Sequence, residues 1–172
     1  MKRDFLKIIG GTVLAFMVIS ALTFGFAFGQ DESRSVGGGV TGGGGGRLEG
    51  TWDVQVTIRN CQTGAAIRTF PSVGTFMSGG TTLDSTSGIP QALKTPGQGV
   101  WSHIRGNTYS FKFKSFSFDA ANNFTGWTII QHEANLDNNG DQYDSGGTAE
   151  VYAPNGTLVF TGCSTTTATR FK

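Results

Sequence analysis

Residues 52–59 read WDVQVTIR, and this stretch decides the fold. Its apolar members alternate with polar ones, which is the period of two that a half-buried β-strand requires. The apolar members are Trp52, Val54, Val56 and Ile58. A lone strand is unstable, because its second edge and its apolar face both need partners. The fold therefore follows from the segments that are able to pair with this one.

Seven further segments carry strand patterns. We expect strands at 66–77, 81–86, 100–104, 108–119, 124–136, 142–153 and 157–171. Short connections rich in Gly and Asn, which tolerate the positive φ of tight hairpins, separate most of them, at Thr63-Gly64, Gly79-Gly80, Gly106-Asn107, Asn122-Asn123, Asn139-Gly140 and Asn155-Gly156. The connection at Ser87–Gln98 is longer. The sequence predicts an all-β, eight-stranded antiparallel up-and-down meander.

Such a meander either exposes two edges or closes on itself. If the first and last strands pair antiparallel, one register places Trp52 beside Arg170 and, with a diagonal offset, Cys61 near Cys163. The Trp–Arg pair then lies on the apolar face, and the cysteines lie on the opposite face. We therefore predict a closed barrel whose seam is fastened by a Cys61–Cys163 disulfide.

One strand pattern changes phase. Phe111 and Phe113 share one parity, whereas Phe116 and Phe118 share the other. We interpret this change as a β-bulge near Lys114-Ser115.

The N-terminal region is typical of an export signal. Residues 1–7 are basic and residues 8–28 are apolar and uncharged, and small residues at Ala27 and Gly29 provide a cleavage site. Residues 1–29 are thus a signal peptide or, if uncut, a membrane anchor. Residues 30–47 form a flexible Gly-rich linker, and 48–172 form the barrel domain. We expect the protein to be secreted or periplasmic, and tethered to the membrane if the segment is not cleaved.

Charge excludes some partners. The formal net charge is +1, and three of the 13 basic and one of the 12 acidic residues lie in residues 1–7. The rest of the chain is nearly neutral, so we expect no nucleic-acid partner and no membrane contact beyond the N-terminal segment. In an oxidising compartment, two cysteines without C-x-x-C spacing predict a disulfide rather than a metal site.

Gly50-Thr51-Trp52 on the first strand and Arg170 on the last resemble the signature of the calycin superfamily, which includes lipocalins and avidins. The ending Thr167–Phe171 also looks avidin-like. This resemblance implies that Arg170 packs across Trp52 at the closed end of the barrel, as a structural cation–π pair. It also implies a lipocalin-like fold around a ligand cavity.

Several residues are candidates for a site, and each has a structural alternative. Gly99-Val100-Trp101 repeats the Gly-x-Trp pattern, so Trp101 either stacks on a ligand or fills the core. His103 and His132 share the inward parity and either bind haem or a metal or are hydrogen-bonded structural residues; a third ligand is missing. Asp137, Asn139 and Asp141 hint at a calcium loop, but a hairpin turn explains them without calcium.

Five apolar residues of the inward row either line a cavity or fill the barrel, because eight strands leave room for side chains or one small ligand. They are Phe111, Phe113, Ile130, Val151 and Phe160. No nucleophile elbow or zinc-protease motif is present, and we expect neither a cofactor nor a resident metal.

The leading hypothesis is a non-enzymatic binding protein for a small apolar ligand. The Ser87–Gln98 loop would border the cavity mouth, and six residues would line the cavity, namely Trp101, His103, Phe111, Phe113, Ile130 and His132. One alternative is an isomerase or cyclase, since barrels resembling allene oxide cyclase and dirigent proteins steer reactive intermediates. Another is a structural surface module with a filled barrel, for which Phe116 and Phe118 would form an exposed apolar patch.

Overall fold

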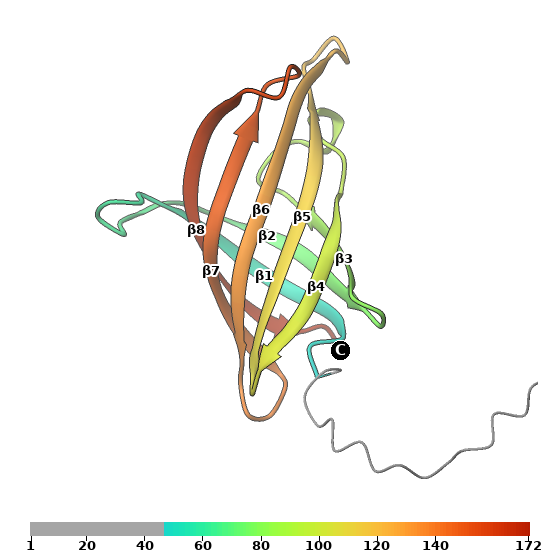
Figure 1. Ribbon diagram of the computed structural model, residues 1–172, viewed down its shortest axis with the longest axis vertical. Helices are drawn as coiled ribbons and strands as arrows, with labels where there is room; N and C mark the ends of the chain where they lie inside the picture. The colour runs from blue at the N-terminus through green and yellow to red at the C-terminus, as the bar shows by residue number, and fades with distance from the viewer. Residues whose placement is uncertain (1–46) are drawn as a thin grey trace, which may run out of the picture. The chain divides into compact units, whose positions relative to one another are not determined.

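Eight antiparallel strands close into a barrel in the computed structural model, which describes residues 47–172 (Figure 1). Each strand pairs with its neighbours in the chain, and the first pairs with the last. They are β1 (Gly50–Arg59), β2 (Ala66–Met77), β3 (Thr81–Thr86), β4 (Gly97–Arg105), β5 (Thr108–Phe118), β6 (Phe124–Leu136), β7 (Gln142–Tyr152) and β8 (Leu158–Arg170). The predicted up-and-down barrel is confirmed.

A short 3₁₀ helix, η1 (Gln91–Leu93), lies in the connection between β3 and β4. No helix within residues 47–172 is long and apolar enough to cross a membrane. The predicted signal or anchor segment, residues 1–29, and linker residues 30–46 lie outside the described residues.

The seam between β1 and β8 has the predicted register. Trp52 is the pairing partner of Arg170, and Arg59 is the partner of Cys163. Cys61 follows the end of β1 and forms the disulfide with Cys163, with their Cα atoms 5.2 Å apart. The diagonal offset arises because Cys61 lies just beyond the last paired residue of β1.

Apart from one-residue differences at the ends of β5, β7 and β8, two details differ from the predictions. β4 begins at Gly97 rather than at Val100, because glycines there hide the alternation of side chains. The predicted bulge at Lys114-Ser115 is wrong: β5 and β6 stay in register there, and the irregularity lies between Ser117 and Phe118. The phase change has another cause, namely that Phe116 lies on the outer surface and is 44% exposed.

Trp52 and Arg170 form the centre of the closed end. The side chain of Trp52 is fully buried, and its indole N–H donates to the Leu48 carbonyl at 3.0 Å. The guanidinium carbon of Arg170 lies 4.2 Å from the Trp52 ring centroid. Tyr143 packs edge-on against the same indole, with ring centroids 4.9 Å apart. The predicted contact between Trp52 and Arg170 is therefore present.

Arg170 also links the residues that precede β1 to the turn between β6 and β7. Its guanidinium donates to the carbonyls of Gly140 at 2.8 Å, Glu49 at 2.7 Å and Arg47 at 2.7 Å. Arg47 in turn donates to the Asn107 side chain at 2.9 Å and to the Asn138 carbonyl at 2.7 Å. Arg47, which we assigned to the linker, thus contacts the closed end of the barrel.

We expect Arg170→Lys to lower the free energy of unfolding by about 3 kcal/mol, because an ammonium cannot reproduce the fork of donors to three carbonyls. Urea denaturation followed by tryptophan fluorescence measures the change. Arg105→Lys, at an exposed position, is the control and should change stability by less than about 0.5 kcal/mol. Equal stability of both variants would contradict the role of Arg170.

We expect the double variant Cys61→Ala/Cys163→Ala to lower the free energy of unfolding by up to about 4.7 kcal/mol, because the bridge closes a long loop that restricts the unfolded chain. The two cysteines are 102 residues apart in the sequence. Chemical denaturation of oxidised protein, reduced protein and the double variant provides the measurement. The reduced protein and the variant should match each other and fall below the oxidised protein.

Candidate functional site: the barrel cavity

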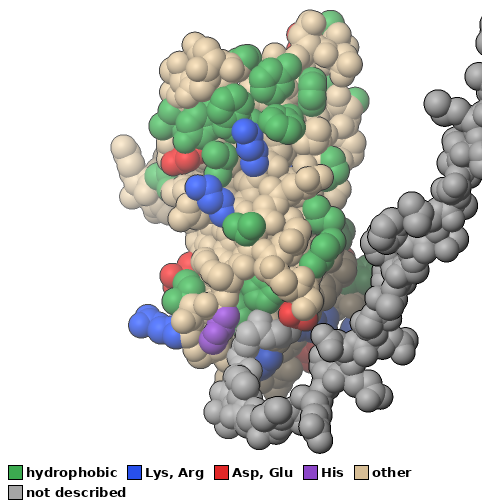
Figure 2. All heavy atoms as spheres, turned by 45° about the vertical axis from the view of Figure 1, so that its right-hand side comes forward, with side chains coloured by type: hydrophobic (Ala, Val, Ile, Leu, Met, Phe, Trp, Pro, Cys, Tyr) green, Lys and Arg blue, Asp and Glu red, His purple; other side chains and the backbone are tan. Residues whose placement is uncertain are grey.

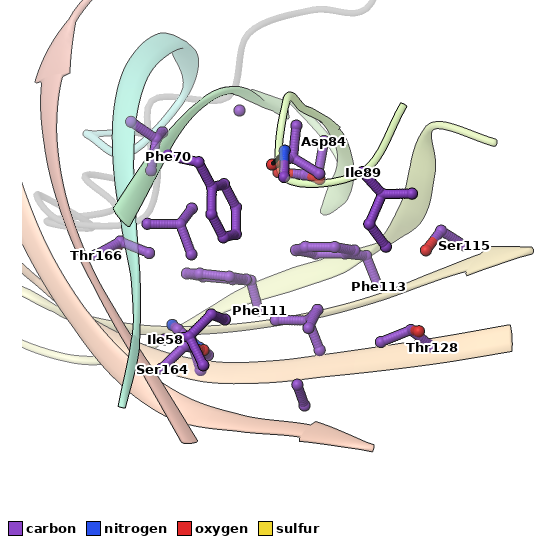
Figure 3. A pocket seen from close by; sticks show the side chains of 18 of the residues that line it. Ile58, Phe70, Asp84, Ile89, Phe111, Phe113, Ser115, Thr128, Ser164 and Thr166 are labelled. Atoms are coloured by element: carbon purple, nitrogen blue, oxygen red, sulfur yellow. Dashed lines mark hydrogen bonds between the residues drawn. The ribbon is translucent and has the colours of Figure 1, made fainter. Parts of the chain in front are cut away.

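The barrel encloses a cavity of about 320 Å³. Most of its walls are aliphatic and aromatic, and Phe111 and Phe113 lie side by side with nearly parallel rings 6.2 Å apart (Figure 3). Asp84 and Ile89 face these rings from across the cavity (Figure 3). The apolar lining includes Val54, Val56, Ile58, Phe70, Phe76, Ile89, Phe111, Phe113, Ile130, Ala149, Val151 and Phe160. The predicted inward row therefore lines a hollow interior.

Glycines on the inner face keep this interior open. A Cβ atom on Gly97 would lie 2.5 Å from the Phe113 ring, and one on Gly147 would lie 2.6 Å from the His132 ring. These rings therefore lie against the backbone of the adjacent strand, where any larger residue would push them away. Glycine at these two positions therefore leaves room for the Phe113 and His132 rings.

A polar cluster interrupts the apolar wall. Asp84 on β3 accepts a hydrogen bond from the Ser72 hydroxyl at 2.7 Å. The Nζ atom of Lys94 lies 4.0 Å from the other carboxylate oxygen, and the Lys94 side chain is only 6% exposed. Lys94 reaches this position because it follows η1 and forms an isolated bridge with Ser117 on β5.

Burial perturbs the titration of this cluster. Desolvation raises the pKa of Asp84, although the Ser72 hydrogen bond and the Lys94 charge oppose the rise. Desolvation also lowers the pKa of Lys94, against the attraction of Asp84. The pKa of Tyr143 is raised by burial and, to a smaller extent, by the Asp84 charge. The cluster is therefore a pair of opposite charges that water solvates poorly.

His132 belongs to a second polar group on the cavity wall. Its Nδ1 is 2.8 Å from the Ser145 hydroxyl, and its Nε2 is 2.8 Å from the Ser164 hydroxyl. Ser145 is in turn 2.6 Å from the Thr166 hydroxyl. Burial lowers the pKa of His132 to about 4, so the imidazole is neutral at pH 7. One ring nitrogen then donates and the other accepts, which satisfies the ring.

The cavity brings together four of the six predicted ligand-contacting residues, namely Phe111, Phe113, Ile130 and His132. Trp101 lies instead in the buried core, where its indole N–H donates to the Met77 carbonyl at 2.9 Å. His103 is exposed, and its Nε2 is 2.8 Å from the Gly106 carbonyl.

The long connection between β3 and β4 contributes Gly88, Ile89 and Lys94 to the cavity wall, as expected of a loop at the mouth. We did not anticipate Asp84 or Lys94. Residues 81–86 read TTLDST, and the face of this strand that carries Asp84 has no apolar residue that would identify it as the inner face. The one available signal is that Asp84 lies two residues after Thr82, so both side chains point to the same face of the strand.

The other candidates are structural. Asp137 closes the β6–β7 hairpin, because its Oδ1 accepts hydrogen bonds from the backbone N–H groups of Asp141 at 2.9 Å and Gln142 at 3.2 Å. In the described part of the chain, no three His, Cys, Asp or Glu side chains come together as a metal site.

Aromatic residues also cluster on the outer wall. Phe124 contacts Phe116 and Phe118, with ring centroids 5.9 and 6.1 Å apart, and Trp127 stacks on Tyr152 at 5.5 Å. Lys114 places its Nζ 4.2 Å from the Trp127 ring centroid. Apolar side chains gather toward one end of the barrel surface in Figure 2. These cross-strand contacts stabilise the outer face of the sheet.

No protein-family model matches the chain, and no curated protein sequence is significantly similar to it. The arrangement of the cavity is therefore the basis for a functional proposal.

We expect His132 to make folding pH-dependent. Above pH 6.5 the ring is neutral in both states, but below it the unfolded chain gains a proton that the folded protein rejects until about pH 4. The free energy of unfolding should therefore fall by about 3 kcal/mol across this window. Urea denaturation at several pH values measures it. His132→Gln should remove this component and the exposed-site control His103→Gln should keep it; an unchanged profile for His132→Gln contradicts the assignment.

Proposed function

We propose that this protein is an exported, non-enzymatic binding protein that holds a small, largely apolar ligand inside its barrel. The observation that carries the proposal is the apolar cavity of about 320 Å³. Well-packed interiors contain few voids larger than a water molecule, so a cavity of this size needs an explanation. Its volume lies at the lower end of the range of small-molecule sites.

The cavity volume limits the size of the ligand. One water molecule occupies about 30 Å³ in the liquid, so 320 Å³ accommodates roughly ten non-hydrogen atoms. The aromatic and aliphatic lining favours a hydrocarbon body. A ligand of this kind gains affinity mainly by leaving water, at about 0.8 kcal/mol for each buried methylene.

The disulfide supports the proposed location. A Cys61–Cys163 bridge is compatible with a periplasmic or extracellular protein, where disulfides persist. Together with the predicted N-terminal signal or anchor, it supports the proposal that the protein works outside the cytoplasm.

An isomerase or cyclase is a second candidate, and one observation favours it. Asp84 is an ionisable carboxyl on the cavity wall whose pKa is raised by burial, which suits a group that accepts and returns a proton. The filled-barrel structural module has less support, because the interior is hollow.

We expect butylbenzene to bind the wild-type protein, and we expect Ala149→Phe to abolish binding by filling the cavity from β7. Ala149 lines the cavity, whereas its neighbour Thr148 is exposed. Thr148→Phe is therefore the matched control and should bind normally. Isothermal titration calorimetry measures affinity, and thermal denaturation verifies folding.

Native mass spectrometry of the protein purified after export should also reveal a co-purified small molecule that Ala149→Phe lacks. Failure of the wild-type protein to bind butylbenzene, with no co-purified molecule, would contradict the proposed function.

A further inference from the structure

The cavity holds an ammonium group with unused hydrogen-bonding capacity. Lys94 has three N–H donors, yet within residues 47–172 its Nζ makes no hydrogen bond, and its charged neighbour Asp84 is 4.0 Å away. That separation is at the outer limit of an ion pair. A buried charge with incomplete partners is costly, so an acceptor on a ligand would stabilise it.

A second free donor lies beside the same carboxylate. Tyr143 lines the cavity, and its hydroxyl takes part in none of the hydrogen bonds between the described residues. It lies 3.8 Å from the position that a Cβ atom on Gly74 would occupy, and Gly74 is the pairing partner of Asp84. The Lys94 ammonium and the Tyr143 hydroxyl therefore converge on the region around Asp84.

The charges on the cavity wall favour a negative ligand group. Arg68 and Lys94 are positive, Asp84 is negative, and His132 is neutral at pH 7. The charged residues that line the cavity therefore sum to one positive charge, and Arg68, which supplies the excess, is an exposed residue. A cationic ligand would be repelled by this excess, and a monoanion would balance it.

We propose that Lys94 and Tyr143 bind the carboxylate of an amphipathic ligand whose hydrocarbon body fills the apolar part of the cavity. The inference rests on the proposed binding function and specifies the chemical class of its ligand. The two carboxylate oxygens match the two free donors, and a charge-assisted hydrogen bond to an ammonium is about twice as strong as a neutral one.

Asp84 is compatible with a bound carboxylate. Ser72 holds one of its oxygens, and Lys94 provides a positive charge between this carboxyl and the ligand. Burial already raises the pKa of Asp84, and a neighbouring carboxylate would raise it further, so a proton taken up by Asp84 would relieve the remaining repulsion.

The test compares probes that differ only in their polar end. Octanoate, octanol and octylamine have equal chain lengths, and octanoate matches the estimated ligand size. Calorimetry on the protein expressed with its complete N-terminal segment, after removal of bound lipid, measures each dissociation constant at pH 7. We expect octanoate to bind at least tenfold more tightly than octanol and octylamine to bind most weakly.

Variants assign the preference to named groups. Lys94→Met removes the charge and keeps the length of the side chain, so the preference for octanoate over octanol should fall below about threefold. Tyr143→Phe removes only the hydroxyl and should weaken octanoate binding without affecting octanol. Lys112→Met, at an exposed position on β5, is the matched control and should leave all three affinities unchanged.

The outcomes separate the inference from the function on which it depends. Equal affinity of the wild-type protein for octanoate and octanol, or a preference for octylamine, would overturn the carboxylate assignment while cavity binding stands. This comparison needs no variant, so a folding defect in Lys94→Met cannot obscure it. Absence of binding by all three probes and by butylbenzene would overturn both proposals.

Discussion

The pairing of β1 with β8 is the constraint on which the structure depends. It converts a meander with two exposed edges into a barrel with an inside, and the inside is where the cavity lies. Arg170 secures this pairing by covering Trp52 and by donating to three backbone carbonyls. The Cys61–Cys163 disulfide adds a covalent link near the other end of the same seam. Closure and cavity are therefore consequences of one strand pair.

Much of this fold was predictable because its signals are local or depend on parity. The alternation of side chains and the turn residues predicted the observed bounds of β2, β3 and β6. The parity of Trp52 and Arg170 predicted the register in which β1 pairs with β8. The errors have physical causes as well. Gly97 and Gly99 contribute no side chain to an alternation, which concealed the start of β4. Phe116 is an apolar residue on the outer surface, so the rule that apolar residues face inward produced a false bulge.

The cavity residues were predictable only in part, because parity identifies a face of the sheet but not a height along the barrel. Trp101 shares the inward parity of Phe111, yet it packs in the core rather than on the cavity. His103 lies near the end of β4 and is exposed. Lys94 belongs to a connection without periodicity, so its entry into the barrel depends on tertiary structure that no local pattern describes.

The same inner face explains why the barrel is hollow and why it retains charge. Glycines let Phe113 and His132 lie against the wall, which leaves volume at the centre. Apolar residues of similar size in place of Asp84 and Lys94 would often stabilise a protein as well or better, because desolvation of a buried ion pair offsets much of its attraction. The pair therefore adds little to the case for stability. Its place on the wall of a largely apolar cavity is the observation on which the proposed recognition of a polar ligand group rests.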